Sequence, residues 1–374
     1  MNQATGADEA AAVTSAAVPG LGAVFAAVML AATLLPVTRG IESPAIWAAA
    51  AFAVVTVVAF LASRHGSLDR RLAAAVAGAS SIAVVVLSGY TLNQGIPVSV
   101  EVPVVQSSFS LVFAAFVTSG LAVGVAVADY FGIGLVGLKE RTQRTTILSA
   151  LGFGGLLAPQ VGALVIALPV MAAIGELSRI QSVVVSQLGM ALGTAILVWW
   201  YLSVTGRDLS YIDLRRPTGR DLLLIAGGVF VIFGTLGAIS LLFQATGVES
   251  SDHGTTQQAA ENPEILLVLV PASILVIGPF EELLYRNIVQ KSLYESFSRV
   301  GAILIGGIIF AIIHTQAYWT AGPGQVVASL AVIFGLALVL GTLYERTENL
   351  LVPALVHGVY NAVLFANLYF TYSA

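Results

Sequence analysis

Apolar stretches of about 20 residues recur along the whole chain and are separated by short polar segments. A helix rises about 1.5 Å per residue, so a stretch of this length crosses a hydrocarbon core of about 30 Å. Hydrophobic residues make up 57% of the 374 positions and charged residues only 10%, whereas an ordinary soluble domain carries about 25% charged residues. We therefore predict an all-α fold, a polytopic integral membrane bundle of about eleven transmembrane helices.

The apolar stretches define the predicted spans. The fifth span is long enough to tilt or to break at Pro159. In chain order, the predicted spans are 21–37, 44–62, 72–92, 108–130, 146–174, 183–204, 222–246, 265–285, 300–317, 325–344 and 350–370.

The spans fall into two groups separated by a polar loop. Residues 1–17 are rich in Ala and contain no Lys or Arg, which is typical of a flexible tail rather than of a signal peptide with a positive n-region. About seven helices are expected in 18–248. Residues 249–263 are rich in Ser, Thr and Gln and are expected to form a flexible external loop. The last four spans form a C-terminal unit, 264–374.

Charge predicts the orientation of the chain in the membrane. Cytoplasmic loops carry an excess of Lys and Arg, and all but two of the 16 Lys and Arg residues lie in alternate connections. Only Arg39 and Arg179 lie on the other side. We therefore expect a protein of the cell membrane with a cytoplasmic N-terminus. The residues on the cytoplasmic side are Arg64, Arg70, Arg71, Lys139, Arg141, Arg144, Arg207, Arg215, Arg216, Arg220, Arg286, Lys291, Arg299 and Arg346.

Composition also excludes several classes of function. The chain has no Cys, so disulfides, thiolate nucleophiles and thiolate metal ligands are excluded. Its net charge is −4 and no basic cluster interrupts the loops, so no nucleic-acid partner is expected.

Three polar motifs interrupt the apolar C-terminal unit: EELLYR at 281–286, FAIIH at 310–314 and HGVYN at 357–361. An ionisable group in an apolar span is costly and is by default a functional hypothesis. Of the four His residues, His314 and His357 lie inside or at the edge of such spans. His65 and His253 lie in polar loops and are interpreted as solvated and uninvolved.

Helix periodicity sorts the polar residues of the motifs. Glu282 and Arg286 are four positions apart, so they share a face and can form an ion pair. Glu281 is turned about 100° from Glu282 and is left for another role. His357 and Asn361 share a face of their helix in the same way.

Depth in the membrane can be compared if the Glu281 helix continues to a turn near Arg299. Glu281 and His314 then lie about 27 Å and 23 Å from that turn, at similar levels in an antiparallel pair of helices. Asn361 can reach this level from a third helix. One pocket containing Glu281, His314, His357 and Asn361 is therefore predicted.

Three kinds of chemistry suit such a pocket. A carboxylate can act as general base toward a water that His314 holds, while His357 and Asn361 donate hydrogen bonds to the oxyanion of amide hydrolysis. Alternatively, Glu281, His314 and His357 are candidate ligands of a metal such as Zn²⁺, which would activate the same water. A proton- or ion-coupled transporter also places carboxylates and His at the midplane.

The three motifs resemble the signature of the CAAX protease and bacteriocin-processing family, also called CPBP or Abi, which includes the type II CAAX prenyl endopeptidases. That signature reads EExxxR, FxxxH and HxxxN. Glu281, Glu282 and Arg286 match the first part, Phe310 and His314 the second, and His357 and Asn361 the third. The resemblance covers about 265–370.

The resemblance implies an intramembrane endopeptidase of the metallo or glutamate type. Glu281 would activate water, His314 would help to position it, and His357 and Asn361 would hold the oxyanion. The substrate would be a hydrophobic or lipidated, CAAX-like peptide reached from membrane lipid. Bacteriocin immunity is another role within the family, so a non-catalytic immunity or scaffold protein remains an alternative.

Overall fold

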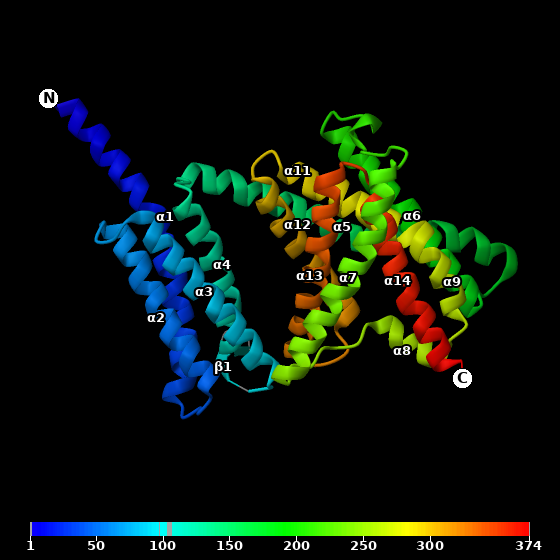
Figure 1. Cartoon of the computed structure of the whole chain (residues 1–374), viewed down its shortest axis with the longest axis horizontal. Coiled ribbons are helices and arrows are strands. Elements are labelled where there is room, and N and C mark those ends of the chain that lie inside the picture. Colours follow the sequence, from blue (N-terminus) through cyan, green and yellow to red (C-terminus); the bar gives the residue numbers. More distant parts are fainter. Residues whose placement is uncertain (1, 97, 103–106, 374) are drawn as a thin grey trace. The chain divides into compact units, whose positions relative to one another are not determined.

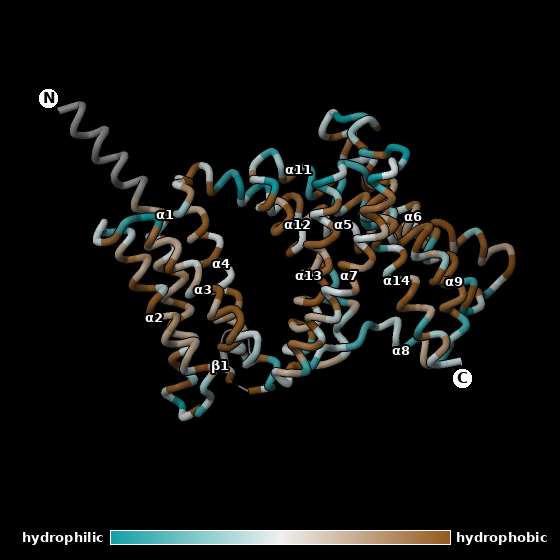
Figure 2. Tube along the Cα trace, viewed as in Figure 1, coloured by the Kyte–Doolittle hydropathy of each residue, from teal (hydrophilic) through white to brown (hydrophobic). Residues whose placement is uncertain are grey.

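A computed structural model describes residues 2–96, 98–102 and 107–373 of the chain (Figure 1). In this part of the chain, eleven helices are long and apolar enough to cross a membrane. The predicted all-α class and the number of spans are confirmed. Figure 2 shows hydrophobic residues along these helices and hydrophilic residues concentrated in the connections.

Ten of the spans each contain one continuous α-helix. These are α1 (Asn2–Thr38), α2 (Pro44–His65), α3 (Arg70–Asn93), α4 (Leu111–Tyr130), α5 (Leu135–Ile174), α6 (Arg179–Val204), α7 (Gly219–Thr246), α12 (Arg299–Ile313), α13 (Pro323–Thr347) and α14 (Leu351–Tyr372).

The remaining span is a composite helix, Ile265–Leu293, in which α-helical and wider π-helical turns alternate. Its parts are α9 (Ile265–Ala272), η2 (Ser273–Ile277), α10 (Gly278–Glu282), η3 (Leu283–Gln290) and α11 (Lys291–Leu293). The helix therefore continues almost to Arg299, where α12 begins, as the depth comparison assumed.

Short elements occupy three of the connections. Strands β1 (Ser99–Val102) and β2 (Ser107–Ser110) pair antiparallel. A 3₁₀ turn, η1 (Leu209–Tyr211), lies between α6 and α7, and α8 (Gly254–Glu261) lies in the loop before α9. Another 3₁₀ turn, η4 (His314–Tyr318), extends α12.

Capping side chains set where several helices begin. Ser178 and Gln181 form a reciprocal capping box at the start of α6, and Thr218 and Asp221 form one at the start of α7. Each box satisfies two backbone donors that the first turn leaves free. Helix α1 begins at Asn2, so it includes most of the predicted tail, 1–17, because Ala favours the helix more than any other residue. Met1 of that tail and the last residue, Ala374, lie outside the described residues.

Contacts within the chain define two compact units. The first contains α1 to α4 and the hairpin, together with Val248–Ser250 and Gly322–Ala328. Small buried side chains such as Ala26 and Ala77 form its core with Phe60. Its buried Asp129 accepts hydrogen bonds from Ser63 (2.7 Å) and Arg70 (2.7 Å).

The second unit runs from Gln143 to Gly247, Ser251 to Ala321 and Ser329 to Ala374. It thus holds α6, α7 and most of α5 together with the helices of the predicted C-terminal unit, 264–374, except for the start of α13. Its main core lies around Leu284, Ile288 and Leu293 of the composite helix. All three sequence motifs belong to this unit.

Helix α5 passes through Pro159 without a break. It crosses α6 with the two backbones in contact. A Cβ atom on Gly162 would collide with the carbonyl oxygen of Gly189, and one on Gly193 would collide with that of Ala158. Small residues four positions apart, such as Gly189 and Gly193, permit this approach between membrane helices.

Candidate active site

The first motif begins in the α-helical turn α10, which lies between two π-helical stretches of the composite helix, and continues into the second of them, η3. Pro271 and Pro279 lie within this helix, and a proline removes a backbone donor and displaces the carbonyl four residues earlier. Single π turns inside α-helices are often found at functional sites. The local sequence therefore accounts for an irregular helix where Glu281 and Glu282 lie.

Two glycines bring the third motif against the first. A Cβ atom on Gly278 would collide with the carbonyl oxygen of Ala354, and one on Gly358 would lie only 2.7 Å from that of Ser273. The backbones of α14 and the composite helix are therefore in contact. Gly358 is adjacent to His357, so this contact sets the position of the His ring.

Glu282 links the first and third motifs through both of its oxygens. Arg286 Nε donates to its Oε2 (2.8 Å), and His357 Nδ1 donates to its Oε1 (3.0 Å). The side chains of Glu282 and Arg286 are completely buried. The predicted pair of Glu282 and Arg286 thus forms and extends to His357.

Glu281 is placed differently from its neighbour. Its Oε2 lies 3.9 Å from His357 Nε2, and this buried oxygen has no hydrogen-bond partner among the described residues. Because the Nδ1 proton of His357 is committed to Glu282, a hydrogen bond from its Nε2 requires the doubly protonated ring. Glu281 therefore has a free acceptor that can bind a proton or a water.

The second motif is joined to the other two through Phe310. The Phe310 ring lies 4.5 Å from the ring of His314 and 6.1 Å from that of His357, and the guanidinium carbon of Arg286 lies 4.7 Å from its centre. His314 Nδ1 donates to the Phe310 carbonyl oxygen (2.7 Å), since a carbonyl only accepts. The Nε2 of a neutral His314 ring is then an acceptor.

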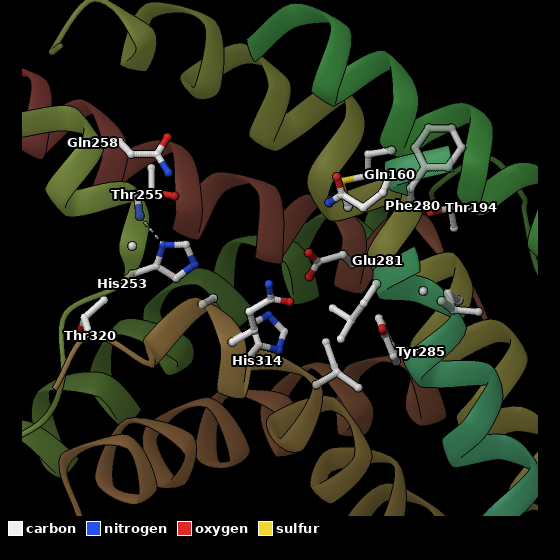
Figure 3. Close-up of a pocket in the computed structure, with 18 residues that line it drawn as sticks. Gln160, Thr194, His253, Thr255, Gln258, Phe280, Glu281, Tyr285, His314 and Thr320 are labelled. Carbon is white, nitrogen blue, oxygen red and sulfur yellow. Dashed lines mark hydrogen bonds between the residues drawn. The ribbon is translucent and has the colours of Figure 1, made fainter. Parts of the chain in front are cut away.

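Glu281 and His314 face one cavity of about 450 Å³ within the second unit (Figure 3). The residues that line this cavity do not include Glu282, Arg286 or His357. The lining residues are Gly155, Leu156, Gln160, Met190, Thr194, His253, Gly254, Thr255, Gln258, Phe280, Glu281, Leu284, Tyr285, Ile313, His314, Gln316, Ala317 and Thr320.

Of the four residues predicted to share one pocket, His357 and Asn361 do not line the cavity. His357 still contacts Glu282, whereas Asn361 is hydrogen-bonded to none of the other three. It lies one turn beyond His357 on α14 and is half-buried. Among the described residues it makes no hydrogen bond, and it does not line the cavity. None of the described lining residues belongs to α14, so the role of Asn361 at the oxyanion stays a prediction.

Helices α5 and α6 contribute a wall of the cavity that the motifs did not reveal. Tyr285, within the first motif, donates from its hydroxyl to the carbonyl oxygen of Gly152 (2.9 Å). A Cβ atom on Gly155 would lie 2.7 Å from the same hydroxyl. The signals in the sequence were the tyrosine inside EELLYR and the glycines at 152 and 155, which allow α5 to approach it.

His253 is not the solvated residue that the sequence suggested. It lines the cavity, its Nδ1 accepts a hydrogen bond from the Thr255 backbone N–H (3.0 Å), and its ring contacts that of Tyr318 edge-on at 5.1 Å. Burial lowers the pKa of His253. The prediction was wrong because the polar loop folds into α8 and covers part of the cavity. His65 is exposed, as predicted.

The described residues do not fit a metal centre. No group of three or more His, Cys, Asp or Glu side chains among them is arranged to hold a metal ion. Of the three candidate ligands, His357 directs Nδ1 to Glu282 and does not line the cavity that Glu281 and His314 share.

Comparison with known proteins supports the family resemblance of the three motifs. Residues 263–363 match the family model described as type II CAAX prenyl endopeptidase Rce1-like. This segment is therefore similar to that family. A protein of Bacillus subtilis (strain 168) named "Putative membrane peptidase YdiL" is 27% identical over 143 residues, which cover 36% of this chain. The match spans 54% of that relative, about half its length. No solved structure matches the chain.

The resemblance predicted from the motifs is thereby confirmed for the C-terminal segment. The matched residues include all three motifs, from Glu281 to Asn361. They do not include α5, α6 or α8, which supply the rest of the cavity wall.

Proposed function

We propose that this integral membrane protein is an intramembrane protease that hydrolyses a peptide bond of a hydrophobic or lipidated peptide in the cavity of the second unit. One observation carries the proposal. Glu281, whose buried Oε2 has no hydrogen-bond partner in the described part of the chain, shares a cavity with His314 among apolar helices. The family match and the similarity to a membrane peptidase support hydrolysis over transport.

The proposed reaction begins with a water molecule held between Glu281 and the Nε2 acceptor of His314. Glu281 takes a proton from this water as the water oxygen forms a bond to the substrate carbonyl carbon. The carbonyl oxygen becomes an oxyanion. Glu281 then returns the proton to the amide nitrogen, the C–N bond breaks, and the carboxylic acid and amine products leave.

The other motif residues hold or complement these groups. Arg286 compensates the charge of Glu282, and Glu282 fixes the ring of His357 through Nδ1. In its doubly protonated form His357, whose Nε2 lies 3.9 Å from Glu281 Oε2, can donate from Nε2 to the oxyanion. Asn361 can add a donor only to a substrate atom outside the cavity. Donors held in place before the reaction typically contribute about 10²–10³-fold each to the rate of acyl transfer.

Zinc would polarise the substrate carbonyl and acidify the water, but it takes no part in the proposed hydrolysis. The described side chains do not fit zinc, and carboxylate and water suffice for the chemistry. We expect cleavage by the purified protein to continue after exhaustive treatment with a chelator and removal of the metal. Loss of cleavage that Zn²⁺ alone restores would contradict the glutamate mechanism.

Substitution tests the hydrolytic site. Purified Glu281→Gln and His314→Ala proteins in lipid are expected to lose at least about 100-fold in cleavage of apolar peptides, tested with and without a lipid anchor. Glu176→Gln, which changes an exposed carboxylate in a loop, is the matched control and is expected to cleave normally. The proposal fails if Glu281→Gln and His314→Ala proteins, folded as judged by their melting, cleave at the rate of the natural chain.

A further inference from the structure

His253 approaches the cavity from outside the three motifs. It precedes α8, and the two residues before it are held by hydrogen bonds. Thr320 Oγ1 donates to the Asp252 carbonyl oxygen (2.7 Å), and Ser329 Oγ donates to that of Ser251 (2.9 Å). Figure 3 shows His253 on the α8 side of the cavity, across from Glu281 and on the same side as Thr255 and Gln258. Its position is therefore built into the second unit.

The hydrogen bond at Nδ1 determines which nitrogen of His253 carries the proton. The Thr255 backbone N–H donates to Nδ1 (3.0 Å), so Nδ1 carries no proton. Burial lowers the pKa of His253, which keeps the ring neutral. The proton of a neutral ring is then on Nε2, at the edge of the ring away from Thr255.

His253 and His314 therefore have opposite chemical characters at their Nε2 atoms. His314 donates from Nδ1 to Phe310 and presents an Nε2 acceptor. His253 accepts at Nδ1 and presents an Nε2–H donor. Among the described residues, the Nε2 of His253 has no partner, so the donor is available to a bound molecule.

The charge of the cavity restricts what that molecule is. Glu281 is the one Asp, Glu, Lys or Arg side chain among the described lining residues. No Lys or Arg is among the described lining residues, so a carboxylate group of a ligand near His253 would meet no permanent cation and would have to lose its hydration. An uncharged oxygen acceptor is favoured, and the backbone carbonyl of an extended apolar peptide is such an acceptor.

We propose that His253 is a substrate-binding residue, whose Nε2–H donates a hydrogen bond to a backbone carbonyl oxygen of an uncharged segment of the peptide. This inference rests on the proposed function and deepens it, since it concerns the peptide that the same cavity takes. Helix α8 then forms part of the substrate site. The peptide is bound by its interior and not by its terminal carboxylate.

The first experiment reads the proton position directly. The chain has only four His residues, so ¹⁵N labelling of imidazole gives four sets of signals in the full chain in lipid nanodiscs, assigned with His→Gln variants. We expect the proton of His253 on Nε2 and that of His314 on Nδ1 at neutral pH. A proton on Nδ1 of His253 would overturn the inference.

The second experiment measures peptide binding without cleavage, in full-length protein that carries Glu281→Gln. The probe is an acetylated apolar pentapeptide amide, Ac-Ala-Leu-Val-Leu-Ala-NH₂. Two further substitutions separate binding from capping. His253→Asn keeps an acceptor near the Thr255 N–H, because Asn is a good N-cap, but has no donor at the position of Nε2. His253→Gln places a side-chain N–H donor near that position, but Gln is a poor N-cap for α8.

The two variants give opposite results under the two explanations. If His253 binds substrate, His253→Asn weakens binding of the peptide amide about 3- to 10-fold, the usual value of one hydrogen bond, and His253→Gln largely preserves it. If His253 only caps α8, His253→Asn binds as the parent does and His253→Gln is impaired. His65→Asn, at an exposed position, is the control and is expected to have no effect.

Two further outcomes complete the test. The same peptide with a free carboxylate is expected to bind more weakly than the amide, and tighter binding would overturn the preference for an uncharged segment. Absence of binding by both peptides would also overturn the inference. These results are independent of the hydrolytic assignment, because they use a chain that lacks the Glu281 carboxylate. Normal cleavage by Glu281→Gln alone would refute the assignment and leave the binding result intact.

Discussion

Two adjacent glutamates in the first motif have different surroundings, and the difference separates their roles. Glu282 has one oxygen bonded to Arg286 and the other to His357. Glu281, one position earlier, has a buried oxygen with no partner among the described residues. A carboxylate whose oxygens are both engaged is suited to holding its neighbours, whereas a free one is suited to binding a proton. Sequence periodicity predicts this divergence, since one step of a helix turns a side chain by about 100°.

The completely buried ion pair leads to a prediction about stability. Arg286→Met leaves Glu282 buried beside a single partner, His357. Removal of one member of a buried pair costs about 3–5 kcal/mol, because the other charge loses its compensation. We expect a decrease of this size in the free energy of unfolding, measured by SDS titration in mixed micelles. The double variant Glu282→Gln with Arg286→Met is the control and should recover part of the loss; a single variant as stable as the natural chain would contradict the prediction.

The lowered pKa of His253 leads to a prediction about how the stability of the folded chain depends on pH. The folded-state pKa of this residue is lowered by burial, whereas the unfolded chain titrates at about 6.5. Above that pH neither state is protonated at this position, and as the pH falls below it the unfolded state binds the proton first. His253→Gln should therefore lose less stability than the natural chain between pH 7 and pH 5, as measured by the melting temperature. An equal loss in both proteins would show that the ring is not buried.

At the scale of elements, the approach of α14 to the composite helix depends on glycine. Gly358→Ala would place a Cβ atom 2.7 Å from the Ser273 carbonyl oxygen, and backbone atoms of two packed helices cannot yield as a flexible side chain does. The helices should move apart and shift His357 from Glu282.

We expect Gly358→Ala to reduce both the melting temperature and the cleavage rate, the latter by about 10-fold or more, because a displacement of about 1 Å can cost 10²-fold. Gly237→Ala is the matched control. It lies in α7 with no atom within 4 Å of the added Cβ, and Ala favours a helix over Gly by about 1 kcal/mol. Equal behaviour of the two variants would show that the contact at Gly358 is not essential.

The sequence predicts the long elements well and the short ones poorly. Apolar length sets the spans, so α2, predicted as 44–62, is found as Pro44–His65. Helix α8 and the hairpin of β1 and β2 are too short for periodicity to reveal them. Helix α8 also has a polar sequence, GTTQQAAE, and it forms because the chain before it is fixed by Thr320 and Ser329. Such contacts between distant residues have no signature in a single sequence.

At the scale of the whole molecule, the sequence locates the motifs but not the complete cavity. The spacing of Glu281, His314 and His357 along three helices predicts that they share one region. The contribution of α5 and α6 was not predicted, because Gln160 and Thr194 are isolated in apolar spans and a glycine does not by itself identify the helix that it contacts. They reach the cavity through glycine contacts that only the folded chain reveals.

The predicted orientation of the chain in the membrane can be tested by labelling single cysteines, because the natural chain contains none. Single Cys substitutions at exposed loop positions can be labelled with a membrane-impermeant maleimide in intact cells, with no background from other thiols. If the N-terminus is cytoplasmic, Glu42→Cys and Glu176→Cys are labelled from outside. Ser67→Cys is labelled only after the cells are opened. The reverse pattern would invert the assignment.

The contact between α5 and α6 has a consequence for how a membrane-embedded peptide arrives. Where Gly162, Gly189 and Gly193 bring the two backbones together, no space remains for an acyl chain to pass. At this crossing the second unit is closed to lateral diffusion from the bilayer. If the proposed function holds, a lipid-anchored substrate reaches Glu281 by another route, and the direction of its approach fixes which face of its scissile bond meets the water.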